Sequence, residues 1–351
     1  MRRGALVGCG FIAPRHLAAW REIPSVMIEA VCDKDPARAR AMANRFGIGR
    51  AFTSLEEMLK NCALDFVDLA SGSETHLQLV RQAIEAGVDV LLQKPFADTP
   101  EAADQIVELA AKSGRTIAVN EMWKWMPAYR HVKSMLAEKA LGDIRNVRFH
   151  KLCNLTLISE DGGVPPFLRL DRQVRFRSMH RLILYEYGVH LLDVLRSWFG
   201  ECTVITAVTS RMSPYVVGED AAFVELGFNS FIGTLELDWS VPGPEVIDPL
   251  HHERVTISGT KGLLIVEAAE RLTCRRIDGS VEGRTFDDDP RAGGFLASQA
   301  DFADAIDRGR RPASPVGDNV KTLRLLWACY ASADAHRSER ENLWTVRASS
   351  A

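Results

Sequence analysis

Three groups of residues in this sequence have types and spacings that could carry chemistry. They are the glycine-containing run 8–13, the QKP run 93–95, and the polar triplet of Glu186, His190 and Asp193. A glycine turn before a helix can hold a phosphate, a lysine can stabilise developing negative charge, and a histidine can accept a proton near neutral pH. The combination indicates proton transfer beside a phosphate-bearing ligand.

The run GCGFIA at 8–13 matches the GxGxxG/A pattern of dinucleotide-binding turns. Gly8 permits the tight turn, Gly10 lets the backbone approach a pyrophosphate, and Ala13 keeps helix and strand close. The helix that follows would point its N-terminus at the anion. We therefore expect Gly8, Gly10, Phe11, Ile12 and Ala13 to bind the cofactor, the alternative being a glycine turn without a ligand.

Asp33 lies at the end of the next strand-like run, about 20 residues beyond the motif. A carboxylate there can accept hydrogen bonds from the adenosine ribose and would repel a 2'-phosphate, so NAD is the expected cofactor. Lys34 and Arg38 could partly offset that charge. NADP therefore stays possible, and Lys34 joins the candidate cofactor-binding residues.

Lys94 and His190 each have a structural explanation beside the chemical one. Lys94 follows a strand-like run, where ligands of open α/β sheets bind, but a solvated lysine at a strand end is common. Glu186, His190 and Asp193 would share one face of a helix. His190 could be a general base there, or a histidine packed for structure.

The elements that must position these groups follow from hydrophobic periodicity. In the first 120 residues short apolar runs alternate with helical patterns, which predicts a parallel sheet covered by helices. The predicted strands are 5–8, 27–33, 66–70, 89–93 and 116–120, and the predicted helices are 36–46, 54–61, 75–87 and 99–114. Beyond about residue 143, strand-like runs follow one another, with helical patterns at 184–199, 295–308 and 318–336.

Composition excludes several classes of protein. The 351 residues carry 43 Lys and Arg against 46 Asp and Glu, a formal charge of -3, so nucleic acid is not an expected partner. No apolar run is long enough to span a membrane, and the glycines after Met1–Arg3 make a poor signal helix. The seven scattered cysteines form no CxxC or His/Cys cluster, so we expect no metal site, reduced thiols and a cytoplasmic location.

These motifs together resemble the glucose-fructose oxidoreductase and inositol dehydrogenase family, Gfo/Idh/MocA. GCGFIA, QKP at 93–95 and EYGVH at 186–190 stand in the order and at the separations of its GxGxxG, EKP and DxGxH motifs. The resemblance covers nearly the whole chain. It implies an α/β Rossmann domain that binds NAD(P) over residues 1–125. It also implies an α+β second domain over 126–351, with an open, predominantly antiparallel sheet for substrate binding and oligomerisation.

The resemblance also assigns roles to individual residues. It gives Lys94 to substrate binding, proton handling and contact with the cofactor. It gives His190 to acid–base catalysis and substrate binding. Glu186 takes the place of the family's usual Asp and would bind the substrate. Gln93 replaces the family Glu and would border the cofactor. Further candidates come from ASGSETH at 70–76 and NEMWKWMP at 120–127: Ser71, His76 and Glu121 near the cofactor, and Trp123 and Lys124 near the substrate. The tryptophans could equally belong to a core between the domains.

The resemblance implies an NAD(P)-dependent dehydrogenase or reductase acting on a secondary alcohol of a sugar, sugar derivative or cyclitol. It also implies a homodimer or homotetramer built on the open sheet face. Two other readings stay open: an NAD-recycling lyase, epimerase or glycosidase, and a non-catalytic sensor of dinucleotide or sugar. The polar segment before the helix could recognise hydroxyls or a carboxylate, or it could be a solvated loop. It contains Arg169, Asp171, Gln173, Arg175, Arg177, His180 and Arg181.

Overall fold

The apolar runs of the first 120 residues form a parallel sheet in the computed structural model, which describes residues 1–156, 174–241, 253–286 and 289–348. Its strands are β1 (Arg2–Val7), β2 (Val26–Cys32), β3 (Arg50–Phe52), β4 (Phe66–Leu69), β5 (Asp89–Gln93) and β6 (Ile117–Asn120). Their order is β3-β2-β1-β4-β5-β6. The five predicted strands are confirmed, whereas β3 is too short to show a period.

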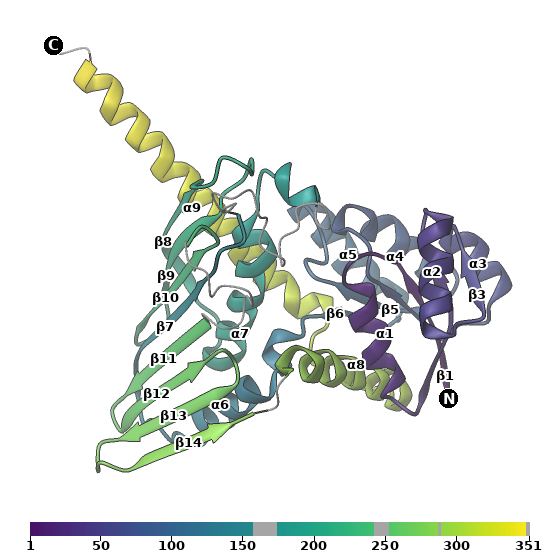
Figure 1. The fold of residues 1–351 in the computed structure, drawn as a ribbon, viewed down its shortest axis with the longest axis horizontal. Helices are drawn as coiled ribbons and strands as arrows, with labels where there is room; N and C mark the ends of the chain where they lie inside the picture. Colours follow the sequence, from purple (N-terminus) through teal and green to yellow (C-terminus); the bar gives the residue numbers. More distant parts are fainter. Residues whose placement is uncertain (157–173, 242–252, 287–288, 349–351) are drawn as a thin grey trace, which may run out of the picture. The chain divides into compact units, whose positions relative to one another are not determined.

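Helices cover both faces of this sheet (Figure 1). They are α1 (Ala13–Arg21), α2 (Pro36–Phe46), α3 (Leu55–Asn61), α4 (His76–Glu85), α5 (Pro100–Ser113) and α8 (Pro290–Arg308). Trp20 of α1 and Phe302 of α8 pack around Phe66 of β4, while α4 packs against α5. The predicted helix 36–46 is confirmed at both ends, because Asp35 caps its start and Gly47 ends it at a φ of 66°.

The chain divides into two compact units, one comprising Met1–Met126 and Arg291–Leu323, the other Pro127–Pro290 and Arg324–Ala351. The predicted second domain, 126–351, differs from this division because 291–323 pack with the first unit. Phe302, Ala303 and Ile306 are buried in its core. A local pattern predicts a helix there but not the sheet on which it packs.

The second unit is built on a mixed, mostly antiparallel sheet. Its order is β14-β13-β12-β11-β7-β10-β9-β8, and β7 with β10 is the parallel pair among those described. The strands are β7 (Ile144–Leu152), β8 (Thr203–Ser210), β9 (Ala221–Gly227), β10 (Ile232–Asp238), β11 (Glu253–Gly259), β12 (Gly262–Glu267), β13 (Arg271–Arg276) and β14 (Val281–Thr285).

One face of this sheet is covered by α6 (Pro127–Ala137) and α7 (Val189–Phe199), with α9 (Val316–Ala348) continuing from the first unit. Burial alternates along residues 231–240, where Leu235, Leu237 and Trp239 are buried. Phe223 and Ile232 point the other way and are 42% and 48% exposed. The sheet thus has one packed face and one open face.

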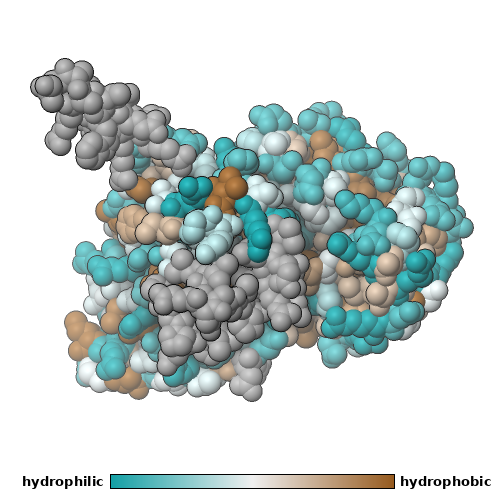
Figure 2. Space-filling model, turned by 45° about the horizontal axis from the view of Figure 1, so that its top comes forward, coloured by the Kyte–Doolittle hydropathy of each residue, from teal (hydrophilic) through white to brown (hydrophobic). Residues whose placement is uncertain are grey.

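The surface and the thiols agree with the composition. Figure 2 shows hydrophilic side chains over most of the visible face of the first unit. All seven cysteines are free thiols, and burial raises the pKa of Cys9 and of Cys32 to about 12. Among the described helices, none is both long and apolar enough to cross a bilayer.

Candidate active site

The turn after β1 contains two glycines with different roles. Gly8 has a φ of 96°, and a Cβ there would lie 2.6 Å from the backbone nitrogen of Ser71. The fold itself therefore requires glycine at position 8. At Gly10 a Cβ would meet nothing within 4 Å. The packing of the protein does not explain that glycine, whereas a pyrophosphate approaching the backbone would.

The start of α1 also fits an anion. Ile12 occupies the N-cap position without a side-chain hydrogen bond, and Pro14 follows in the first turn. Ala13 is fully buried in the core beside β1, while Phe11 is 57% exposed. The partial positive charge of the helix N-terminus and the bare Gly10 backbone therefore suit the diphosphate of a dinucleotide.

Gly10→Ala separates ligand binding from folding. We expect the variant to fold normally, because the added methyl group meets no protein atom, and to bind NAD about tenfold or more weakly because the methyl group occupies the approach to the backbone. Titration calorimetry with thermal melting checks both quantities. Gly49→Ala is the matched control, since its Cβ is equally unobstructed. NAD binding unchanged in Gly10→Ala would remove Gly10 from the cofactor site.

Asp33 lies directly beside this turn. Its Oδ2 accepts a hydrogen bond from the Cys9 N–H at 2.7 Å, and its Oδ1 accepts one from the Asp35 N–H at 2.9 Å. Lys34 is exposed, and Arg38 lies 3.5 Å from Asp35. Arg38 thus contacts the carboxylate of Asp35, whereas it was expected to offset the charge of Asp33.

The turn after β4 brings Ser71 next to Gly8. The Ser71 hydroxyl lies 2.8 Å from the Thr75 hydroxyl, within the short turn η1 (Ser73–Thr75). His76 is fully buried, with Nδ1 3.1 Å from the Phe96 carbonyl and Nε2 3.2 Å from the Ser71 carbonyl. Burial lowers the pKa of His76. His76 therefore joins the loops after β4 and β5, and its ring nitrogens face protein carbonyls.

Lys94 follows β5 directly and is half-buried. The Lys94–Pro95 peptide is cis. The backbone N–H of Lys94 donates to Gln93 Oε1 at 2.7 Å, and Gln93 Nε2 lies 3.4 Å from His16 Nε2 of α1. Gln93 is 8% exposed, so its side chain lies in the interior of the unit and not at its surface.

The segment after β6 is mostly enclosed. Glu121 is fully buried, Trp123 is 4% exposed in the turn η2 (Trp123–Trp125), and Lys124 is half-buried. Of the three, Lys124 presents the most side-chain surface. The low exposure of Trp123 fits the alternative that it serves packing.

The predicted helix 184–199 is present, but its first turn is the π-turn η5 (Leu184–Gly188). The N–H of Val189 reaches back to the Leu184 carbonyl, five residues earlier. The i, i+4 rule that placed Glu186 and His190 on one face assumes an α-helix, so it does not describe this turn. Both residues are buried.

Glu186 is held by an ion pair. Its Oε1 lies 2.5 Å from Nη2 of Arg175, in the turn η4 (Val174–Arg177). The Arg175 side chain is 57% exposed, while that of Glu186 is 7% exposed. Arg175 was one of several polar candidates in its segment; Arg169, Asp171 and Gln173 lie outside the described residues. The Arg175 guanidinium donates a charge-assisted hydrogen bond to Glu186.

Glu219 is a site-supporting residue that the sequence did not reveal. One of its carboxylate oxygens accepts hydrogen bonds from the N–H groups of Leu182 (2.9 Å) and Leu184 (3.3 Å) and from the Tyr330 hydroxyl (2.7 Å). Glu219 therefore caps the helical segment that carries Glu186 and His190. Burial raises the pKa of Glu219. These partners are remote in sequence, so no local motif marks them.

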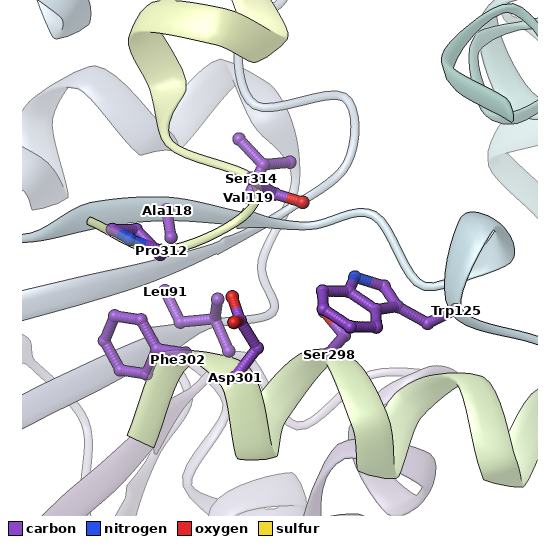
Figure 3. A pocket seen from close by; sticks show the side chains of 9 residues that line it. All are labelled: Leu91, Ala118, Val119, Trp125, Ser298, Asp301, Phe302, Pro312 and Ser314. Carbon is purple, nitrogen blue, oxygen red and sulfur yellow. The ribbon is translucent and has the colours of Figure 1, made fainter. Parts of the chain in front are cut away.

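A small hollow in the first unit is not a ligand site. It is lined by Leu91, Ala118, Val119, Trp125, Ser298, Asp301, Phe302, Pro312 and Ser314 (Figure 3). Asp301 accepts hydrogen bonds from Arg310 and from the Ala313 N–H, so its carboxylate is engaged by the protein. The hollow has no room for a substrate. Within the described ranges, no three His, Cys, Asp or Glu side chains could together hold a metal ion.

Each unit thus contains one set of candidate functional residues. The first brings Gly8, Gly10, Asp33 and Ser71 together at the carboxyl ends of β1, β2 and β4, with Lys94 at the end of β5. This is where open parallel sheets bind dinucleotides. The second presents an imidazole and a carboxylate paired with arginine on one helical segment. Such groups can move a proton and bind hydroxyls.

Two family models match most of the chain. The GFO/IDH/MocA oxidoreductase family model, with an NAD-binding Rossmann fold, matches residues 2–121. The GFO/IDH/MocA C-terminal domain model matches residues 129–265. The predicted resemblance is confirmed by both models.

Similar proteins are known along nearly the full length. A D-apiose dehydrogenase from Paraburkholderia graminis is 32% identical over 346 residues, which cover 96% of this chain and 88% of that protein. A D-apiose dehydrogenase from Rhizobium rhizogenes is 28% identical over 342 residues, covering 94% and 95%. The crystal structure of an oxidoreductase from Agrobacterium radiobacter in complex with NAD+, L-tartaric acid and magnesium has a TM-score of 0.86. It is 26% identical, and the match covers 95% of this chain and 96% of that one.

Proposed function

The chain belongs to the GFO/IDH/MocA family of oxidoreductases, and from this premise we propose that it interconverts an alcohol and a carbonyl on a sugar, a sugar derivative or a cyclitol. Its first unit is an NAD-binding Rossmann domain, and the chain is a dehydrogenase or reductase of CH–OH groups. The observation that carries the choice of substrate class is the full-length similarity to two D-apiose dehydrogenases.

In this proposal two side chains handle the hydroxyl proton. Lys94 hydrogen-bonds the reacting oxygen and stabilises its developing negative charge, and His190 accepts the proton. Glu186 binds a neighbouring hydroxyl, and Arg175 holds its carboxylate in place by a charge-assisted hydrogen bond. A dinucleotide held by the glycine turn and Asp33 would supply the hydride acceptor, its nicotinamide ring. In the reductive direction His190 returns the proton.

The proposal includes a preference for NAD over NADP. Asp33 carries a negative charge beside the glycine turn, where it would repel a 2'-phosphate. Arg38 contacts Asp35, which leaves less positive charge directed at that position. Lys34 is the exposed cation adjacent in sequence.

Asp33→Ala should weaken NAD binding more than NADP binding, because it removes both a ribose hydrogen-bond acceptor and a charge that repels phosphate. Titration of each nucleotide by fluorescence or calorimetry measures the ratio of dissociation constants. Asp33→Asn is the matched variant: it keeps an acceptor for the Cys9 N–H but lacks the charge, so it shows how much of the preference is electrostatic. A ratio unchanged in both variants would exclude Asp33 from cofactor selection.

The oligomeric part of the proposal is a homodimer or homotetramer formed through the open sheet face. Its support is the exposure of Phe223 and Ile232 on that face. Sedimentation over a range of concentrations tests it. A single monomeric species throughout would contradict it.

The purified protein should be screened with NAD and NADP against sugars and polyols, following absorbance of the reduced cofactor. The panel includes D-apiose, an inositol, aldoses, uronates and L-tartrate, and product analysis runs in parallel. Stoichiometric NADH formation on one compound supports the proposal. Product formation without accumulated NADH would indicate an NAD-recycling enzyme, and ligand binding with no conversion would indicate a sensor.

A further inference from the structure

We propose that His16 is a positioning residue for Lys94, which it holds through the side-chain amide of Gln93, with the single ring proton of His16 on Nδ1. The role of Lys94 in this inference rests on the proposed function. The arrangement of His16 and Gln93 does not, because it lies wholly within the described first unit.

His16 is fully enclosed in that unit. It lies on α1, three positions after Ala13, and its side chain has 0% exposure. Its ring packs against Phe295 of α8, with centroids 5.1 Å apart. An imidazole with no access to solvent must satisfy both nitrogens inside the protein.

The partner of Nδ1 fixes the first proton. Asp68 Oδ2 of β4 lies 2.8 Å from Nδ1, and the Asp68 side chain is also fully buried. A carboxylate oxygen accepts, so Nδ1 carries the hydrogen. Asn120 Nδ2 also approaches Nδ1, but at 3.5 Å, so the shorter carboxylate contact decides the assignment. Trp20 Nε1 donates to the same Asp68 oxygen at 2.7 Å.

The partner of His16 Nε2 decides whether this nitrogen donates or accepts a hydrogen bond. Gln93 Oε1 accepts the Lys94 N–H at 2.7 Å, and this short contact sets the orientation of the Gln93 amide. Gln93 Nε2 therefore faces His16 Nε2, at 3.4 Å, and donates to it. Nε2 must then be an acceptor, which is the neutral ring protonated on Nδ1.

A directed chain of hydrogen bonds results. The His16 Nδ1–H donates to Asp68, the Gln93 amide donates to His16 Nε2, and the Lys94 N–H donates to Gln93. Each donor in this series of hydrogen bonds has one acceptor. The series connects helix α1 to the backbone of Lys94, and it explains why position 93 is a glutamine. A carboxylate there would present a second acceptor to a nitrogen that has no proton.

Gln93→Glu tests the direction of the chain. The introduced carboxylate keeps the acceptor for the Lys94 N–H but repels the Nε2 lone pair, so Lys94 is held less well. We expect turnover on the substrate found in the screen to fall at least about tenfold at pH 8, with NAD affinity unchanged.

The groups that contact the His16 ring fit this assignment. Among the described side chains hydrogen-bonded to the ring or packed on it, Asp68 alone carries a charge. The others are Gln93 of β5, Asn120 of β6 and Phe295 of α8. Gln105→Glu is the matched control, because this exposed glutamine of α5 undergoes the same change far from the chain of hydrogen bonds. It should not show the loss of turnover.

Nitrogen-15 NMR of histidine-labelled wild-type protein tests the proton directly and needs no substrate. The His16 signal, identified by its disappearance in His16→Gln, should show a protonated Nδ1 and an unprotonated Nε2 at pH 8. A proton on Nε2, or turnover unchanged in Gln93→Glu, would overturn the inference. If no compound in the screen is oxidised, the proposed function fails, and the His16 arrangement is still judged by its nitrogen shifts and by the titration of labelled Lys94 in wild type and Gln93→Glu. An unchanged Lys94 titration would then count against positioning.

Discussion

Replacing Lys94 or His190 with alanine is expected to lower turnover at least about a hundredfold while NAD affinity stays nearly the same. Lys94 directly follows β5, whereas the glycine turn follows β1. His190 belongs to the other unit. Neither side chain is part of the Gly8–Ala13 turn. Loss of a proton-transfer group should therefore appear in kcat and in kcat/KM rather than in nucleotide binding.

Steady-state kinetics on the substrate identified by the screen, with NAD titrations, measures this effect. Lys112→Ala is the control for Lys94, because Lys112 is an exposed lysine of α5 paired with Glu108. His190 is only 6% exposed, so His190→Asn and a thermal melt are needed to separate lost chemistry from lost packing. Near-normal turnover in both alanine variants would make the catalytic assignment wrong.

Removing the carboxylate of Glu253 is expected to destabilise the second unit by about 3–5 kcal/mol. Glu253 Oε2 lies 2.7 Å from the Lys151 ammonium, and the two side chains are 1% and 0% exposed. Tyr129 donates its hydroxyl to the other oxygen of Glu253. The ammonium of Lys151 also lies 5.3 Å from the ring of Tyr187, the residue after Glu186. Glu253→Ala leaves a buried ammonium without its carboxylate.

Urea unfolding followed by two probes, one for each unit, measures this loss, because a chain of two units need not unfold in one step. The double variant Lys151→Met, Glu253→Leu should recover part of the stability, since it removes both buried charges together. Glu56→Ala is the surface control: its pair with Lys60 is 67% and 70% exposed, so little change is expected. A loss in Glu253→Ala no larger than that of the control would show that the buried pair contributes little.

Local signals predicted most of the first unit. The strands of a parallel sheet are buried on both sides and form continuous apolar runs, so β1, β2, β4, β5 and β6 were visible in the sequence. Helix α2 has matching start and stop residues in Asp35 and Gly47. The glycine turn also depends on adjacent residues.

Long-range contacts limited the rest of the prediction. Helix α8 was expected as a helix, yet its place in the first unit depends on Phe66 and Trp20, far away in sequence. The π-turn η5 breaks the α-helical spacing on which the grouping of Glu186 with His190 relied. His16 was not singled out, because its partners come from three different strands and become neighbours only in the folded sheet.

The capping carboxylate of Glu219 has a practical consequence for altering the chain. It accepts from the backbone at the start of the segment that carries His190 and from the hydroxyl of Tyr330 on α9. Removing the last helix, or replacing it with that of another protein, would therefore disturb the position of His190 without changing any residue near it in sequence. Engineering of the carboxyl terminus must keep the tyrosine as well as the helix.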